Sequence, residues 1–170
     1  MVILFSGRKS AVEREIIEIL CKYGANYISD KAVSAGDGGF TIISEYKKTD
    51  INLKNGIAVF IDDTDRFENQ VFPDGITGIC EDKNITALGI FKASGIPVIS
   101  CGMSAKNTVT LSSLGSGSLL ASLQRTVTDL SGGEVEPGEF KIRLTKPYTH
   151  FAVMASAAVL LLSGIVPDVF

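Results

Sequence analysis

The first part of the chain alternates between short, continuously apolar runs and longer segments in which apolar residues recur at helical spacing. The runs have the length of strands buried on both faces of a sheet, and they lie at residues 2–5, 57–61, 76–80 and 97–101. After the first run, apolar residues share one helical face at Val12, Ile16, Ile19, Leu20 and Tyr23. Ser10 and Glu13 have the spacing of a capping box, and Gly24 is a stop signal. The chain therefore opens as a strand, a turn and a helix.

The pattern is weaker between residues 29 and 55. Residues 34–39 form a glycine-rich loop, residues 40–44 have the length of a strand, and residues 47–54 are polar and expected at the surface. A second helix is predicted to begin after Asp82 or Asn84, since either side chain can cap it, and to extend to Ser94. Gly95 with Pro97 just beyond supplies its stop signal.

After Gly102 the helical period gives way to alternation, which predicts antiparallel strands at residues 108–114, 119–127 and 140–144. A final helix follows, with Pro147 in its first turn and apolar residues at every position from 151 to 162 except Ser156. The whole pattern predicts one α/β domain, residues 1–170. We expect a Rossmann-like, mostly parallel sheet with helices, followed by an antiparallel β-ribbon and an apolar C-terminal helix.

The apolar final helix also bears on partners. A helix with no polar face is either a core helix or a membrane span, and a span needs about 20 apolar residues. This run stops at Ser163 and Gly164, so no membrane partner is expected. A second copy of the chain is a simple cover for such a helix, which predicts a homo-oligomer, most simply a homodimer, through residues 147–163. The apolar end Val169–Phe170 would also gain from docking. The alternative is that the sheet and ribbon of the same chain cover the helix.

Composition and charge further restrict the class of protein and the partners that are expected. The chain has 170 residues, 45% of them hydrophobic and 21% charged, which is typical of a folded domain. The net charge is −3 and no Lys/Arg run is present, so no nucleic-acid partner is expected. Cys21, Cys80 and Cys101 are too far apart for a zinc motif, which predicts buried, reduced thiols. The chain starts directly with a strand-like run and no basic leader, which predicts a cytoplasmic location.

Acidic residues directly follow one of the buried strands. Asp62, Asp63 and Asp65 come just after residues 57–61, where the sites of α/β proteins usually lie. Carboxylate oxygens are suitable Mg²⁺ ligands, so these three residues are candidate metal ligands. The alternative is a solvated loop without a ligand.

Two other loops are candidates for anion binding. Gly7, Arg8, Lys9 and Ser10 bring two cations to a helix N-terminus, although a capping box alone also explains Ser10. Glu81 and Asp82 follow the strand at 76–80 and are expected at the same edge of the sheet, as part of an anion or nucleotide site. The glycine-rich residues 34–39 are a third, weaker phosphate-loop candidate because no clear strand precedes them.

The order of parts in the second half, mainly residues 76–166, resembles the central, ATP-binding domain of Mur ligases. In that family an N-x-D-D-like turn leads to a helix, a strand ending in Phe-Gly, a β-ribbon and an Ala-rich helix ending in Leu-Gly-Ile. The corresponding segments here are residues 80–84, the helix to Ser94, residues 98–102, residues 108–144 and residues 152–165, which end in Ser-Gly-Ile. The resemblance implies the core of an ATP-dependent amide ligase.

Several positions depart from that family pattern. Aligning Lys9-Ser10 with the end of the family's G-x-x-G-K-[ST] loop places Phe5 and Arg8 where glycines would surround phosphate. Cys80 replaces the asparagine of N-x-D-D, and Lys83 or Glu81, depending on the register, replaces one carboxylate. No asparagine starts the last helix, and the flanking domains are absent.

We therefore hypothesise a degenerate, shortened central domain that acts as a non-catalytic binding or interaction protein without a cofactor. The alternative is a small enzyme or sensor that binds a nucleotide or phosphometabolite at the carboxyl ends of the strands.

Overall fold

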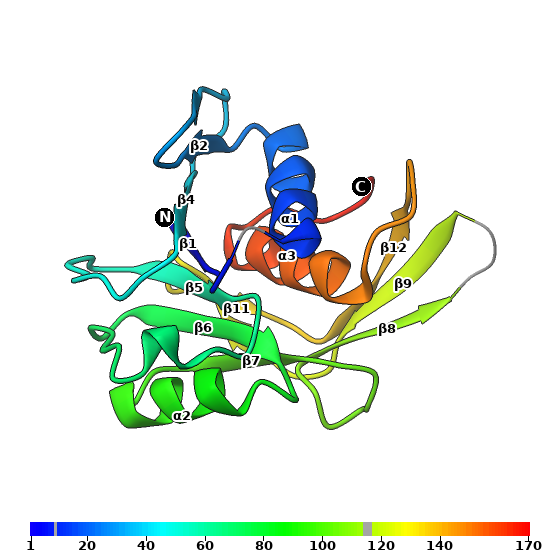
Figure 1. The fold of residues 1–170 in the computed structure, drawn as a ribbon. Helices are drawn as coiled ribbons and strands as arrows, with labels where there is room; N and C mark the ends of the chain where they lie inside the picture. The colour runs from blue at the N-terminus through cyan, green and yellow to red at the C-terminus, as the bar shows by residue number, and fades with distance from the viewer. Residues whose placement is uncertain (9, 114–116) are drawn as a thin grey trace.

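A computed structural model describes residues 1–8, 10–113 and 117–170 of the chain. A ten-stranded sheet separates α1 (Ala11–Lys22) and α3 (His150–Leu162) on one face from α2 (Ile85–Ser94) on the other (Figure 1). Its strands are β1 (Val2–Phe5), β2 (Asn26–Ile28), β3 (Val33–Ser34), β4 (Thr41–Glu45), β5 (Gly56–Phe60), β6 (Ile76–Glu81), β7 (Val98–Cys101), β8 (Val109–Ser113), β9 (Ser118–Leu123) and β12 (Gly138–Arg143). The expected α/β class and the mostly parallel sheet are confirmed.

The parallel part of the sheet runs in the order β8-β7-β6-β5-β1-β4-β2. β1 lies inside it, where Val2 pairs with Ile42 on one side and Ile57 on the other. Both faces of β1 are covered, which explains its uninterrupted apolar sequence. The weak pattern at residues 29–55 concealed β3, and β2 just before it was also missed; these two short strands extend the sheet beyond β4.

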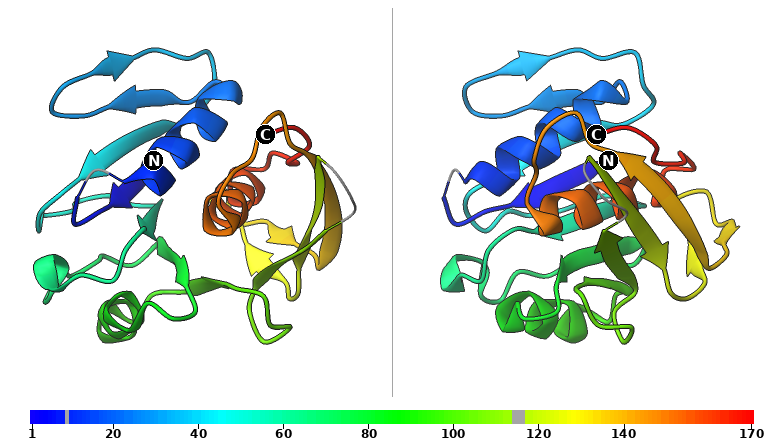
Figure 2. Two further views of the ribbon diagram at one scale, coloured as in Figure 1. Left: turned by 45° about the vertical axis from the view of Figure 1, so that its right-hand side comes forward. Right: turned by 90° about the vertical axis from the view of Figure 1, so that its right-hand side faces the viewer.

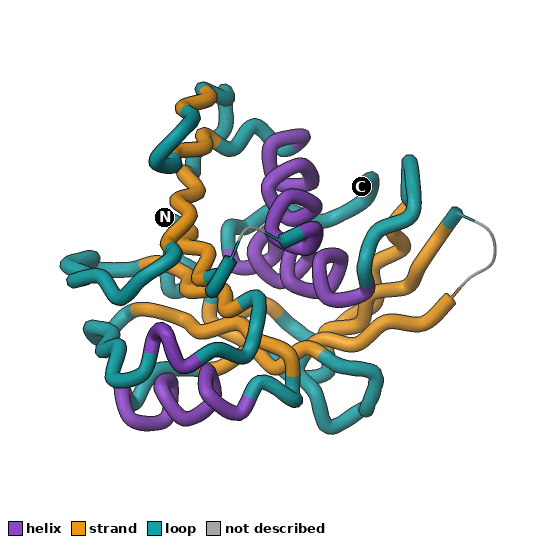
Figure 3. The backbone as a smooth tube through the Cα atoms, viewed as in Figure 1, coloured by secondary structure: helices purple, strands orange, loops and turns teal. Residues whose placement is uncertain are grey.

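The antiparallel strands mostly continue the main sheet. β8 pairs with β7 in parallel through Val109 and Cys101, and the antiparallel pairs follow between β8 and β9 and between β9 and β12 (Figure 3). The separate ribbon is smaller than expected and consists of β10 (Val127–Thr128) and β11 (Glu134–Val135). The strand predicted at 119–127 is therefore two strands, because the chain leaves the sheet after Leu123. The end of the strand predicted at 108–114 lies outside the described residues.

α3 is enclosed by its own chain. Every residue from Phe151 to Leu162 is buried, and the antiparallel end of the sheet curves around the helix while α1 packs beside it (Figure 2). Complete burial is therefore confirmed, and the cover comes from the same molecule. Across residues 1–8, 10–113 and 117–170, no helix has both the length and the apolar character needed to cross a membrane.

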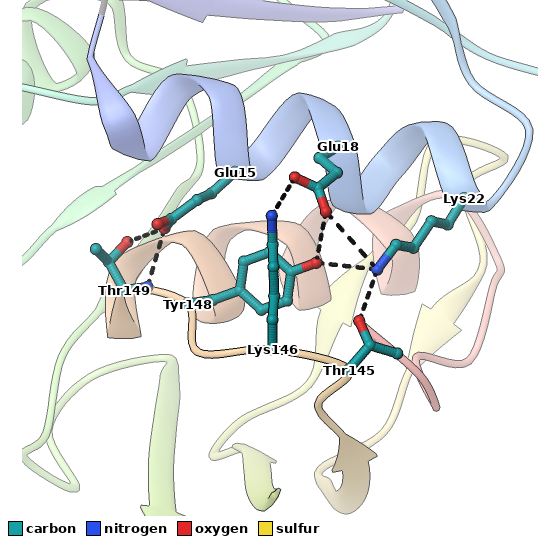
Figure 4. Close-up of polar contacts among 7 residues, drawn as sticks. All are labelled: Glu15, Glu18, Lys22, Thr145, Lys146, Tyr148 and Thr149. Atoms are coloured by element: carbon teal, nitrogen blue, oxygen red, sulfur yellow. Dashed lines mark hydrogen bonds and ion pairs between the residues drawn. The ribbon is translucent and has the colours of Figure 1, made fainter.

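The start of α3 differs from the prediction. Pro147 is not in its first turn, because the helix begins at His150 with Thr149 as its N-cap. The preceding segment is bound to α1 instead (Figure 4). Glu15 accepts hydrogen bonds from the Thr149 amide at 2.9 Å and its hydroxyl at 2.7 Å. Contacts with a distant helix thus outweigh the local preference of proline for a helix start.

Glu18 is the second carboxylate that joins α1 to this segment (Figure 4). It accepts hydrogen bonds from Lys146 Nζ at 2.5 Å and from the Tyr148 hydroxyl at 3.0 Å, and Lys22 Nζ lies 4.0 Å away. The hydrogen bond from Lys146 is the largest cause of a pKa for Glu18 below its usual value. Because these side chains are largely exposed, the network positions the segment but adds little stability.

The last residues close the edge of the sheet at β12. Val169 forms a parallel bridge with Arg143, and the Phe170 amide donates to Arg143 O at 2.9 Å. The Thr145 amide donates to Phe170 O at 2.6 Å. The Phe170 ring is fully buried and meets Tyr23 edge-on, with 6.1 Å between ring centroids. The expected docking of this apolar end is therefore seen, within its own chain.

Candidate functional site

The carboxyl ends of β1, β5, β6 and β7 meet at one edge of the sheet because these strands are parallel neighbours. The segments that follow them carry Gly7, Asp62, Asp82 and Gly102. This edge therefore brings together the β1–α1 turn and both groups of acidic residues that the sequence indicated. We call it the carboxyl-edge site.

The centre of the carboxyl-edge site is a contact between Gly7 and Asp62. The Gly7 amide donates to Asp62 Oδ1 at 2.8 Å, and Asn84 Nδ2 donates to Asp62 O at 3.1 Å. A Cβ on Gly7 would lie 3.0 Å from Thr64 Oγ1 and 3.2 Å from Asp62 Oδ2. A side chain at position 7 would therefore crowd the β5 loop, against which the β1–α1 turn packs closely. The carboxylate holds a backbone N–H of the kind that an anion would otherwise bind.

The rest of the β1–α1 turn is also internally bonded. The buried Ser6 hydroxyl donates to Arg8 O, and Ser10 Oγ accepts the Glu13 amide at 3.0 Å as the N-cap of α1. The predicted cap is therefore confirmed. The Glu13 carboxylate, only 2% exposed, accepts from the Tyr46 hydroxyl at 2.7 Å. Burial, and then the bond to Glu13, raises the pKa of Tyr46. Lys9 lies outside the described residues.

The three aspartates after β5 do not form one ligand set. Asp62 binds Gly7, whereas Asp63 Oδ1 accepts the Thr86 amide at 3.2 Å in the first turn of α2. Asp65 is exposed and begins the short 3₁₀ helix η1 (Asp65–Phe67). Among the described residues, no group of three or more His, Cys, Asp or Glu side chains is placed to hold a metal ion. Asp63 is exposed, as a solvated loop predicts, but its carboxylate also binds a free amide of a helix N-terminus.

Replacing Asp63 by alanine is therefore expected to lower the free energy of unfolding by about 1 kcal/mol, as loss of a capping side chain does. Asp65→Ala is the matched control, because Asp65 is exposed in the same segment, and its effect should stay within about 0.5 kcal/mol. Urea denaturation followed by circular dichroism measures both values. Equal effects of the two substitutions would contradict the role assigned to Asp63.

Asp82 and Glu81 have different environments. Asp82 Oδ2 accepts Asn107 Nδ2 at 2.9 Å, and the Asp82 amide donates to Cys101 O at 3.0 Å. Glu81 is exposed at the end of β6. A Cβ on Gly102 would lie 2.3 Å from Asn107 Nδ2, so glycine allows this contact. Sequence reasoning missed Asn107, which lies 25 residues from Asp82 and belongs to no recognisable motif.

The structure assigns the cap of α2 to Asn84 and not to Asp82. Asn84 is buried, and its Oδ1 accepts the Ala87 amide at 2.9 Å. Its amide nitrogen binds the β5 loop at Asp62 O, so a single side chain joins the helix N-terminus to the carboxyl-edge site.

The glycine-rich residues 34–39 lie away from this site and serve backbone packing. The Gly38 amide donates to Gly24 O at 2.7 Å, just past the end of α1. A Cβ on Gly36 would lie 2.1 Å from Gly24 O. Close backbone approach therefore accounts for these glycines without a phosphate.

The three cysteines are free thiols. Cys80 and Cys101 are buried, whereas Cys21 is only partly buried, so the expectation of buried thiols holds for two of the three. Burial raises the pKa of Cys80 to about 12 and that of Cys101 well above its usual value. Both thiols therefore stay protonated at neutral pH, which makes them poor nucleophiles.

The fold and site define an α/β protein with a Rossmann-like sheet whose carboxyl-edge turn is bonded to its own chain. Similar folds occur in solved structures of Mur ligases. MurF from Acinetobacter baumannii matches with a TM-score of 0.57 and 10% identity over 96% of this chain and 42% of its own. A UDP-N-acetylmuramoylalanyl-D-glutamyl-2,6-diaminopimelate–D-alanyl-D-alanyl ligase from the same organism matches with a TM-score of 0.56. The two sequences are 14% identical over 96% of this chain and 43% of the ligase.

A third similar structure is the UDP-N-acetylmuramate:L-alanyl-gamma-D-glutamyl-meso-diaminopimelate ligase (MPL) from Neisseria meningitides. It has a TM-score of 0.56 and 11% identity over 99% of this chain and 62% of its own. The chain thus spans between two fifths and two thirds of these ligases, and the likeness is one of fold. No family model and no curated protein sequence matches the chain.

Proposed function

We propose that this protein is a non-catalytic binding or interaction protein, built on a shortened and degenerate Mur-ligase-like core. The observation that carries the proposal is the hydrogen bond from the Gly7 amide to Asp62 Oδ1 at 2.8 Å. In a phosphate-binding loop, successive backbone N–H groups must be free to surround the anion. Here the amide of the turn's glycine is bound to a carboxylate of the neighbouring loop.

Electrostatics adds to this argument. A phosphate that approached the Gly7 amide would meet the Asp62 carboxylate, and two like charges about 4 Å apart near a surface repel by about 4 kcal/mol. Displacing the carboxylate would break a charge-assisted hydrogen bond worth about 1.5–3 kcal/mol. Arg8 also carries a Cβ and a long side chain where a phosphate loop needs glycine. Each factor weakens nucleotide binding, and together they support a role without ATP chemistry and without a cofactor.

ATP turnover is therefore expected to be indistinguishable from background, and ATP with Mg²⁺ should leave the melting temperature unchanged. A bound nucleotide at 100 times its Kd would add about 2.7 kcal/mol of stability, which shifts Tm by several degrees in a chain of this size. A phosphate-release assay and a thermal-shift titration measure the two quantities. Mg²⁺-dependent turnover that disappears in Lys9→Ala would contradict the proposal.

The second candidate is a small enzyme or sensor that binds a nucleotide or phosphometabolite at the carboxyl-edge site. It is favoured by the convergence of Gly7, Asp62 and Asn84 at the position where α/β proteins usually bind ligands. The same thermal-shift titration separates the two candidates, because only this one requires stabilisation by a phosphate compound. In that case Asp62→Ala should change the size of the shift, whereas the exposed Asp65→Ala should not.

A homodimer through α3 and a cytoplasmic location stay predictions. The reason for expecting the dimer has weakened, because α3 leaves no apolar face uncovered within one chain. Sedimentation velocity of the wild-type chain tests whether a dimer forms.

A further inference from the structure

The face of the sheet that carries α2 has a shallow groove that meets the carboxyl-edge site at Asp65 and Thr86. It consists of two hollows of about 310 and 340 Å³ that share Gln70 in their walls. The first lies between η1 and α2 and is lined by Ile85 and Gly89 among others. The second is lined by Ile51 and Val71 among others. We call these joined hollows the α2 groove.

The α2 groove exposes two large aliphatic side chains. Ile85 is 76% exposed and Val71 is 68% exposed. A Cβ on Gly89 would meet nothing within 4 Å, so the space above this turn of α2 is open. The opposite side of α2 packs Ala87, Ile90 and Phe91 into the core. A partner seated on the uncovered side of α2 could therefore bury Ile85.

The walls of the groove are fixed before any partner arrives. The Gln70 side chain is 3% exposed, and it donates to Thr49 O at 2.8 Å and accepts the Thr49 amide at 3.1 Å. The Phe72 amide donates to Ser94 Oγ at 3.2 Å, which attaches the neighbouring loop to the end of α2. A preformed surface of this kind loses little conformational freedom on binding.

The charged residues of the rim indicate the kind of partner. Asp65, Glu68 and Asp50 line the two hollows, and Lys48 is the one base that does so among the described residues. Arg66 and Lys92 are exposed nearby without lining either hollow. We propose that the α2 groove docks a basic amphipathic segment of another protein. Its apolar side chains would cover Ile85 and Val71, while its lysines or arginines face the acidic rim. This inference rests on the interaction role proposed above but uses a different face of the molecule.

A peptide-display selection on the intact wild-type chain tests the inference directly. We expect enrichment of sequences with apolar residues at helical spacing and several Lys or Arg residues. A synthetic copy of an enriched peptide is then measured by fluorescence anisotropy. Ile85→Glu should weaken its binding at least about 10-fold, as loss of a central contact does. Val33→Glu is the matched control, because Val33 is also an aliphatic residue, 78% exposed, on the distant strand β3.

A second pair of variants tests the role of charge. Glu68→Lys should weaken the same peptide about 10-fold and reduce the salt dependence of binding, whereas Glu139→Lys on β12 should change neither. Circular dichroism and Tm confirm that each variant folds, and the charge variants decide the matter if Ile85→Glu does not fold.

The inference would be overturned by a selection that yields no binder, or one that yields acidic or neutral binders. It would also be overturned if the Ile85→Glu variant binds the enriched peptide as tightly as the wild type does. Sedimentation velocity tests whether a second copy of the chain, and not another protein, occupies the groove. A wild-type dimer that Ile85→Glu converts to a monomer would show that a second copy of the chain fills the groove, which also overturns the inference. The absence of ATP binding would still support the non-catalytic role after any of these results, so the two proposals fail separately.

Discussion

Replacing Phe60 by alanine is expected to lower the free energy of unfolding by about 3–5 kcal/mol, the cost of removing a fully buried aromatic side chain. Phe60 is 1% exposed on β5 and stacks on Phe5 at 4.8 Å between ring centroids. It also meets Phe91 of α2 edge-on at 5.2 Å and Phe67 at 5.5 Å. One substitution therefore removes contacts to the sheet, to α2 and to η1 at once. The free energy of unfolding of such domains is only about 5–15 kcal/mol, so the substitution would remove a large part of the native stability.

The free energies of unfolding of Phe60→Ala and Phe140→Ala, both measured by urea denaturation, are compared. Phe140 is a partly buried phenylalanine on β12, where the same change of volume should cost less. The dependence of the unfolding free energy on urea should stay the same in both variants, because the surface exposed on unfolding hardly changes. A loss at Phe60 no larger than the loss at Phe140 would show that the aromatic cluster relaxes around the vacancy.

The parallel strands and helix boundaries were largely predictable because their signals are local. Uninterrupted apolar runs fix β1 and β5, since only strands covered on both faces tolerate such sequences. Ser10 could be recognised as a cap because the amide that it accepts is three residues away. β2 and β3 were missed because they are short and largely exposed, with almost no apolar pattern to reveal them.

The contacts that define the carboxyl-edge site were not predictable, because they join distant parts of the chain. The Gly7 amide and Asp62 are separated by 55 positions, and Asn107 and Asp82 by 25. The sequence placed Asp62 and Asp63 correctly after a strand, but it could not show that backbone amides would take up their carboxylates. A metal site and a capping site use the same residue type, and only the position of the neighbouring amides distinguishes them.

The apolar final helix illustrates the same limit. Its composition predicted burial, and every residue from Phe151 to Leu162 is buried. Composition does not identify what covers a helix, and here the cover is α1 and the curved, antiparallel end of the sheet. The exposed large aliphatic side chains lie elsewhere, among them Ile85 on the outer side of α2 at 76% exposure. The docking surface proposed for a partner is therefore on the face of the sheet opposite α3.

Replacing Phe170 by alanine is expected to cost about 3 kcal/mol, at the lower end for a buried phenylalanine because it is the last residue and its surroundings can relax. The Phe170 ring is fully buried against Tyr23, and its backbone exchanges hydrogen bonds with Arg143 and Thr145. The Arg143 amide donates to Asp168 O of the same tail at 2.9 Å. Once the ring no longer holds the tail, the Arg143 and Thr145 amides should lose their partners and exchange with solvent faster. The open edge of β12 should then increase aggregation. Hydrogen exchange followed by mass spectrometry measures the first effect and light scattering the second. Val166→Ala is the control, because Val166 lies in the same tail but is 66% exposed. Unchanged exchange at Arg143 and Thr145 in Phe170→Ala would show that the backbone bridge holds the tail without the ring.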